Sequence, residues 1–195
     1  MLMKLSKIKI EDYKKIKDIL EKGGIFIYPT ETIYGIGGNA LIESVYDRIK
    51  RIKQRDDKKN FIWLFKDIDM MRKFTFINSK EEQLIKKYHP GPLTIILKSK
   101  IENFDYIACR ISSHPFLNKL FEFINFPIIS TSANISNQQY IHEFDLIYSI
   151  FSKKVDLLVE DDIENKDNNA LPSTIVKVEN NRIIILRKGK IKLHT

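Results

Sequence analysis

The sequence has 195 residues, 43% of them hydrophobic and 30% charged, with 33 Lys and Arg against 25 Asp and Glu and a net charge of +8. This composition excludes an intrinsically disordered chain and a fibre, and no apolar run approaches the roughly 20 residues that span a bilayer. The single cysteine, Cys109, excludes an internal disulfide and suits a reducing compartment. Residues 1–10 lack the apolar core of a secretory signal, so we expect a cytoplasmic protein with no membrane association.

Apolar periodicity predicts helices along the chain. The first ends at Gly23-Gly24, and the third opens on a capping box formed by Ser79 and Glu82. The predicted helices cover residues 13–20, 42–52, 79–88 and 115 to about 123.

Short apolar runs predict strands at residues 25–28, 61–65, 93–97, 106–111, 127–130, 155–159, 174–178 and 182–186. Asn180-Asn181, between the last two, predicts a hairpin turn. Helices interleaved with buried strands, together with this hairpin, predict an α/β fold with a twisted mixed sheet flanked by helices. No Pro/Gly/Ser linker divides the chain, so we expect one domain over residues 1–195. The acidic, Asn-rich residues 160–171 are interpreted as a solvated loop, with a lid over a site as the alternative.

Several common catalytic motifs are absent from the sequence. The glycines form neither a P-loop nor a dinucleotide-binding fingerprint, and there is no G-x-S-x-G elbow. His89, His114, His142 and His194 have no metal-ligand spacing, so surface or helix-capping roles are expected for them. Cys109 lies in a strand pattern, which favours a small buried side chain over a nucleophile. Covalent and metal-hydrolase chemistry are therefore disfavoured.

Polar and cationic side chains instead follow predicted strands. The turn at residues 29–35, Pro-Thr-Glu-Thr-Ile-Tyr-Gly, offers hydroxyls and backbone N–H groups at the carboxyl end of a strand, where open α/β sheets bind ligands. An ordinary Thr/Gly loop would look the same. The run at residues 53–59 carries four cations and suits a polyphosphate, with a solvated charge run as the alternative. Arg55 favours function, because the chain is poor in arginine and we attribute most of its lysine to compositional bias.

Arginines and hydroxyls recur at three further strand ends. Arg110 stands between Cys109 and Ile111, so it should be partly buried and paired, with a ligand or in a structural ion pair. The segment 130–134, Ser-Thr-Ser-Ala-Asn, suits hydrogen bonds to phosphate or a capped helix start. Ser173-Thr174 and Arg187 bracket the closing hairpin. Together these positions predict a hydroxyl-lined cationic cleft for nucleotide phosphates and a small carboxylate.

At these motifs the sequence resembles the YrdC-like family of threonylcarbamoyl-AMP synthases. The resemblance extends from about residue 8 to residue 191 and rests on seven segments that follow in family order. They are Pro29-Thr-Glu-Thr-Ile-Tyr-Gly35, Lys53-x-Arg55-x-x-x-Lys59, Pro90-Gly-Pro-Leu-Thr94, Arg110 with His114-Pro115, Ser130-Thr-Ser-Ala-Asn134, Pro172-Ser-Thr-Ile175 and Ile185-Leu-Arg-Lys-Gly189.

The resemblance implies a twisted α/β sheet with a large concave basic cleft. It also implies a reaction in which L-threonine, bicarbonate or CO2, and ATP give threonylcarbamoyl-adenylate and pyrophosphate. A separate transferase complex would then move the threonylcarbamoyl group to tRNA. Mg²⁺ would be carried by the ATP phosphates, without a metal site on the protein and without a bound prosthetic group.

The resemblance also implies roles for individual residues, with Lys53 and Arg55 as catalytic cations. The threonine would be bound by Thr32, Arg110, Ser130 and Ser173, with Arg110 on its carboxylate. The ATP would be bound by Lys53, Arg55, Lys59, Ser132, Asn134 and Arg187. The alternative is a non-catalytic YrdC/YciO-like protein that binds RNA or a nucleotide, and weak RNA binding would agree with the charge of +8.

Overall fold

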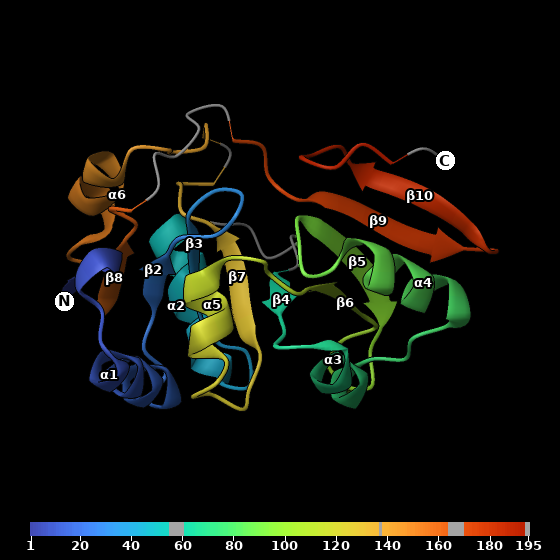
Figure 1. Cartoon of the computed structure of the whole chain (residues 1–195), viewed down its shortest axis with the longest axis horizontal. Coiled ribbons are helices and arrows are strands. Elements are labelled where there is room, and N and C mark those ends of the chain that lie inside the picture. The colour runs from blue at the N-terminus through green and yellow to red at the C-terminus, as the bar shows by residue number, and fades with distance from the viewer. Residues whose placement is uncertain (55–60, 137, 164–169, 194–195) are drawn as a thin grey trace.

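The computed structural model describes residues 1–54, 61–136, 138–163 and 170–193 (Figure 1). The strands are β1 (Leu2–Lys4), β2 (Phe26–Tyr28), β3 (Gly35–Asn39), β4 (Ile62–Leu64), β5 (Leu93–Lys98), β6 (Tyr106–Arg110), β7 (Ile128–Ser132), β8 (Leu157–Glu160), β9 (Thr174–Glu179) and β10 (Arg182–Arg187). The helices are α1 (Ile10–Glu21), α2 (Glu43–Lys53), α3 (Ile68–Phe74), α4 (Ser79–Tyr88), α5 (Pro115–Leu120) and α6 (Phe144–Phe151), with a 3₁₀ turn η1 (Leu5–Lys7).

The strands form one mixed sheet in the order β1-β8-β2-β3-β7-β4-β6-β5-β9-β10. The pairs β1–β8, β2–β8, β4–β6 and β5–β9 are parallel, and the other neighbours are antiparallel. In Figure 1 the N-terminus and α1 lie at one end of the sheet and the β9–β10 hairpin at the other. The predicted α/β fold with a mixed sheet is therefore confirmed, while the large basic cleft and the single domain stay predictions.

Local sequence explains where the predicted elements begin and end. In α1 the apolar stripe buries Ile16 and Leu20, and Gly23, with a φ of 77°, follows the helix in the left-handed conformation that ends many helices. Asn180 and Asn181 have φ angles of 48° and 61°, which confirms the predicted hairpin turn between β9 and β10.

The capping-box prediction was wrong by one residue. The first residue of α4 is Ser79 itself, and its N-cap is Asn78, whose side chain accepts a hydrogen bond from the Glu81 N–H. The Glu81 carboxylate accepts one from the Asn78 N–H in return. Asn and Ser are both good N-caps, so an Asn-Ser pair leaves the start of a helix open by one position.

Five elements were not predicted, namely β1, η1, β3, α3 and α6. The β3 sequence, Gly-Ile-Gly-Gly-Asn, lacks an apolar alternation because its neighbours need small residues. A Cβ atom on Gly37 would lie 1.9 Å from the Ile129 carbonyl oxygen of β7. Strand β7 also runs two residues past its predicted end at Ser130, to Ser132. These hydroxyls are therefore held on the sheet rather than on a loop.

The interpretation of residues 160–171 as a solvated loop was wrong at its start. Glu160 still belongs to β8, and the Asp161 side chain is only 2% exposed. The Asp161 N–H donates to the Tyr34 hydroxyl at 3.0 Å, and its carboxylate lies 3.4 Å from His114 Nε2. His114 also caps α5, since its Nδ1 accepts from the Phe116 N–H. Residues 164–169 lie outside the described residues.

The core lies along the sheet, where fully buried side chains include Phe26, Tyr28 and Phe65. Cys109 is buried there, which confirms the expectation of a small buried side chain. Burial raises the pKa of its thiol well above the ordinary value. Among the helices of the described residues, none combines the length and apolarity that crossing a membrane needs.

Candidate active site

A pocket of about 120 Å³ opens where β7, β6 and the β9–β10 hairpin meet the loop between β2 and β3. We call it the central pocket. It is lined by Thr30, Thr32, Ile33, Tyr34, Gly35, Ile62, Arg110, Ser130, Thr131, Ser132, Tyr140, Pro172, Ser173, Ile175 and Arg187. Six residues chosen from the sequence are among them, namely Thr32, Arg110, Ser130, Ser132, Ser173 and Arg187. The structure therefore gathers residues that are up to 155 positions apart in the chain.

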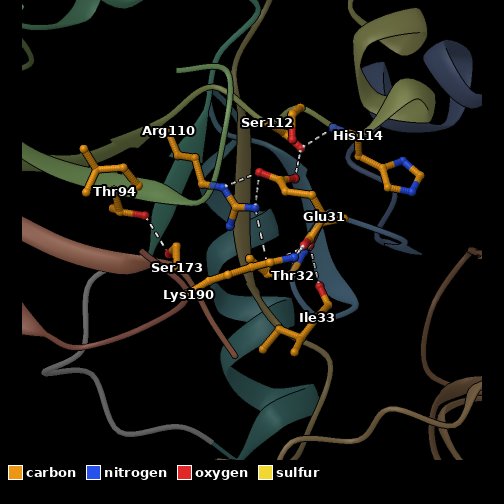
Figure 2. Close-up of polar contacts among 12 residues, drawn as sticks. Glu31, Thr32, Ile33, Thr94, Arg110, Ser112, His114, Ser173 and Lys190 are labelled. Atoms are coloured by element: carbon orange, nitrogen blue, oxygen red, sulfur yellow. Dashed lines mark hydrogen bonds and ion pairs between the residues drawn. The ribbon is translucent and has the colours of Figure 1, made fainter. Parts of the chain in front are cut away.

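Arg110 enters the central pocket from the last position of β6. Because side chains alternate along a strand, Cys109 points into the core and Arg110 to the opposite face. Its guanidinium forms a buried ion pair with Glu31, with 2.6 Å between Nη2 and Oε1. Its Nε–H donates to the same oxygen at 3.2 Å. The structural ion pair that the sequence left open is therefore present, and the arginine still lines the pocket (Figure 2).

Glu31 is fixed on its other side as well. The Ser112 hydroxyl donates to Oε2 of Glu31, and Lys190 Nζ donates to the Glu31 carbonyl oxygen at 2.8 Å. Figure 2 shows the Glu31 carboxylate between Arg110 and Ser112. Burial opposes ionisation here, but the Arg110 charge and the Ser112 and Arg110 hydrogen bonds outweigh it and hold the pKa of Glu31 below its ordinary value. The Glu31 carboxylate is therefore ionised at neutral pH.

The Thr30–Thr32 turn fixes the direction of two hydroxyl protons. The Thr30 hydroxyl donates to the Ile33 carbonyl oxygen at 2.7 Å, so in its 2.9 Å contact with Thr32 it must accept. The Thr32 hydroxyl therefore donates to Thr30. Its oxygen accepts from Arg110 Nη2 at 3.3 Å. With its own proton committed, Thr32 presents an acceptor to the central pocket.

Arg187 and Ser173 form the opposite wall. Arg187 donates through Nε and Nη2 to the Ser173 carbonyl oxygen, at 3.1 and 2.7 Å, and through Nη2 to the Ser173 hydroxyl at 3.0 Å. That hydroxyl is also 2.8 Å from the buried Thr94 hydroxyl. Burial lowers the pKa of Arg187 from its ordinary high value, but an arginine remains protonated at neutral pH, so the guanidinium carries its charge in a partly dry site.

A β-bulge brings Arg187 to the pocket side of β10. Ile185 pairs with Val176, and the next paired residue is Arg187, opposite Ile175, so that Leu186 is skipped. Ile175 lines the central pocket, and residues paired across antiparallel strands share a face. In a regular ladder Leu186 would occupy this position, so the bulge exchanges an apolar side chain for a cation.

Lys53 lies at the end of α2 rather than in a loop, and it is 2% exposed. Its ammonium group donates to the carbonyl oxygens of Ser132 and Asn134 and to Asn134 Oδ1. Asn134 is buried too, and its amide donates to the Gln138 carbonyl oxygen at 2.7 Å. Neither Lys53 nor Asn134 lines the central pocket, but both contact Ser132, which does. Arg55 and Lys59 lie outside the described residues.

Sequence reasoning missed Glu31, Ser112, Thr94, Tyr140 and Lys190 as members of this site. Thr94 and Glu31 stand inside quoted motifs, but the sequence does not show which residues their side chains contact. One signal could have suggested the ion pair. Glu31 is an acidic residue between two threonines, and Arg110 was expected to be partly buried and paired.

A scan of family models matches residues 18–189 to the Sua5/YciO/YrdC family, described as "Telomere recombination". A protein of Methanocaldococcus jannaschii named "Putative threonylcarbamoyl-AMP synthase" is 36% identical over 201 residues, covering 98% of this chain and 94% of the relative.

Two solved structures agree with this match. The fold resembles that of P. abyssi Sua5 complexed with L-threonine, with a TM-score of 0.88 and 25% identity over 97% of this chain. This chain spans only 57% of that longer protein. The fold also resembles that of E. coli YciO, with a TM-score of 0.84 and 23% identity, covering 97% of this chain and 94% of the other. From the family match and the 36% identical relative, we conclude that the chain belongs to the Sua5/YciO/YrdC family.

Proposed function

We propose that this protein is a threonylcarbamoyl-AMP synthase. It would convert L-threonine, bicarbonate or CO2, and ATP into L-threonylcarbamoyl-adenylate and pyrophosphate. The observation that carries the proposal is the central pocket, in which two arginines face hydroxyls from three separate segments. The name of the M. jannaschii relative and the L-threonine complex of P. abyssi Sua5 support it.

In this proposal threonine is held by Thr32, Arg110, Ser130 and Ser173. The Nη1 end of Arg110 binds the carboxylate, because the Glu31 carboxylate already occupies the Nε–Nη2 edge. Thr32, whose own proton is committed to Thr30, accepts a hydrogen bond from the substrate. In this arrangement a small polar amino acid has a partner for its carboxylate in Arg110 and a partner for one of its hydrogen-bond donors in Thr32.

ATP would lie beside the threonine, with its phosphates facing Arg187, Ser132 and the end of α2. Lys53, Arg55, Lys59 and Asn134 complete the ATP site in the proposal, with Lys53 and Arg55 as catalytic cations. Lys53 would have to exchange a carbonyl contact for a phosphate oxygen, since its ammonium donates to Ser132 and Asn134. Mg²⁺ enters on the ATP phosphates as part of the substrate.

The chemistry requires no protein nucleophile. The deprotonated threonine amine attacks CO2 and, after losing a proton, becomes a carbamate. A carbamate oxygen then attacks the α-phosphorus of ATP, the bond to the bridging oxygen breaks, and pyrophosphate leaves. Negative charge builds up on phosphate oxygens, so fixed cations and hydrogen-bond donors lower the barrier. Holding the two substrates side by side supplies the rest.

The proposal extends to the protein's place in the cell. The adenylate would pass to a tRNA threonylcarbamoyl transferase complex, which would make the reaction the first step of a tRNA modification. We propose that it takes place in the cytoplasm and that residues 1–195 act as one catalytic domain.

The test is an assay of pyrophosphate release with purified protein, Mg²⁺–ATP, bicarbonate and L-threonine. We expect release that depends on threonine, together with the adenylate detected by mass spectrometry. Threonine-independent release, or none, would contradict the proposal. The non-catalytic alternative predicts no turnover, and instead RNA binding that weakens steeply with salt or ATP binding without turnover.

A further inference from the structure

The Arg110 guanidinium has one occupied edge and one open end. Nε donates to Oε1 of Glu31, and Nη2 forms an ion pair with the same oxygen. Nη2 also donates to the Thr32 hydroxyl. No residue that the structure describes accepts a hydrogen bond from Nη1. Since a guanidinium is planar, fixing the Nε–Nη2 edge also fixes the direction in which Nη1 points. The contacts that Glu31 makes with the Nε–Nη2 edge therefore determine the direction in which Nη1 points.

Glu31 is itself held from several directions. Ser112 donates to its second carboxylate oxygen, and the Ser112 hydroxyl in turn accepts from the His114 N–H at 3.2 Å. Lys190 holds the Glu31 carbonyl oxygen from the C-terminal segment. The side chains of Glu31 and Arg110 are 13% and 6% exposed. Because Glu31 keeps the Ser112 hydrogen bond independently of Arg110, it acts as a fixed anchor and not as a mobile counter-ion.

We propose that Glu31 is a positioning residue for substrate recognition: it anchors the Nε–Nη2 edge of Arg110 so that the Nη1 end meets the carboxylate of the substrate. The identity of that substrate, L-threonine, rests on the proposed function. Glu31 touches no substrate atom in this role and acts through Arg110. Ser112 supports it by holding the second carboxylate oxygen.

The opposite role for Glu31 is competition. A carboxylate beside an arginine also neutralises it, and in that case removing Glu31 would free the cation and tighten the binding of another carboxylate. Anchoring and competition therefore predict changes of opposite sign in threonine affinity. The sign separates the two roles.

The experiment compares the wild type with Glu31→Gln and Glu31→Ala, using calorimetric titration with L-threonine and with L-threoninol, which lacks the carboxylate. Gln keeps an oxygen that can accept from Arg110, whereas Ala keeps none. We expect threonine affinity to fall about threefold in Glu31→Gln and about tenfold in Glu31→Ala, with threoninol affinity unchanged within about twofold. The exposed Glu122→Gln serves as the matched control, because it also removes a carboxylate that is paired with a cation.

Equal losses for threonine and threoninol would overturn the proposal, because they would indicate general damage to the pocket. Tighter threonine binding in either variant would overturn it in favour of competition. A wild type that does not prefer threonine to threoninol would also overturn it. Pyrophosphate release by the wild type is measured separately, so that a failure of the proposed synthase reaction is distinguishable from a failure of the Glu31 role. Thermal melting of each variant checks that it is folded.

Discussion

Arg110 and Arg187 both line the central pocket, but only the charge of Arg110 is neutralised by a neighbouring carboxylate. Arg110 is paired with the ionised Glu31, so the two together carry no net charge. Arg187 donates to a carbonyl oxygen and a hydroxyl, which are neutral acceptors, so it keeps its full positive charge. Arg110 can therefore orient a ligand with little long-range attraction, while Arg187 attracts anions. This division fits an amino acid on one side and phosphates on the other.

Replacing Arg110 by lysine tests this division at one side chain. A lysine ammonium can pair with Glu31, but it cannot also present a second donor end to a substrate carboxylate. We expect Arg110→Lys to raise the KM for threonine about tenfold while the KM for ATP changes less than about twofold. Steady-state kinetics with each substrate varied in turn would measure both constants.

The exposed Arg182→Lys, at the start of β10 and outside the lining of the central pocket, is the control for this substitution and should leave both constants unchanged. If Arg110→Lys raised the two KM values equally, Arg110 would not be specific to the threonine side.

At the scale of elements, the end of α2 and the end of β7 are joined by one buried ammonium. Lys53 donates to two backbone carbonyl oxygens in the segment from Ser132 to Asn134, and the Ser136 N–H donates to the Lys53 carbonyl oxygen at 3.0 Å. The contact runs in both directions between the same two segments. The position of Ser132 in the pocket therefore depends on the last turn of α2.

Lys53→Met tests this connection through stability. The substitution keeps a long side chain but leaves the buried Asn134 carbonyl oxygen without the Lys53 donor. The Ser132 carbonyl oxygen loses one donor and keeps the Asn134 N–H. This should lower the free energy of unfolding by about 2–3 kcal/mol. Urea denaturation measures the change. The exposed Arg51→Met, on the same helix, also removes one positive charge and should change it by less than about 0.5 kcal/mol. Equal effects of the two substitutions would mean that Lys53 contributes only charge.

The sequence predicts elements that bury an apolar face and misses those that do not. Helices α1, α2 and α4 show apolar residues at helical spacing, and most strands are short apolar runs. Strand β3 shows neither signal, because close approach to β7 selects glycine. The residues of the site likewise divide into those that the sequence predicts and those that it does not. Residue types at strand ends predict six residues of the pocket, but the Glu31–Arg110 pair joins positions 79 residues apart and follows only from the order of strands in the sheet.

For the whole molecule, one histidine makes folding sensitive to acid. His89 Nε2 lies 2.8 Å from the Leu93 carbonyl oxygen, so this nitrogen carries the proton, and Nδ1 has no hydrogen-bond partner among the described residues. Burial, with a smaller contribution from the Arg110 charge, lowers the pKa of His89 to about 4 from an unfolded value of 6.5. Because the unfolded chain binds the proton more readily, stability falls as the pH drops from 6.5 towards 4.

His89→Gln removes this titration and keeps a side-chain N–H that can reach Leu93. We expect the wild type to lose about 2–3 kcal/mol more than the variant between pH 7.5 and pH 4.5, as measured by urea denaturation at both values. Other acid-sensitive groups cancel in the difference. His142→Gln, in the segment that precedes α6, is the matched control and should behave like the wild type. An identical loss in the wild type and in His89→Gln would place the acid sensitivity elsewhere.

The bulge in β10 also affects the exposed edge of the whole sheet. β10 is the last strand in the sheet order, and no strand in the described part of the chain pairs with its outer side. The N–H and C=O groups on that side could recruit a strand from another molecule. The bulge interrupts that row beside Leu186, which is 56% exposed and would otherwise extend an apolar edge. Arg182 and Arg187 place cations at the two ends of the strand. The bulge that brings Arg187 to the pocket thus also protects this edge against aggregation. Selection for solubility and selection for ligand binding would therefore both preserve the extra residue, Leu186.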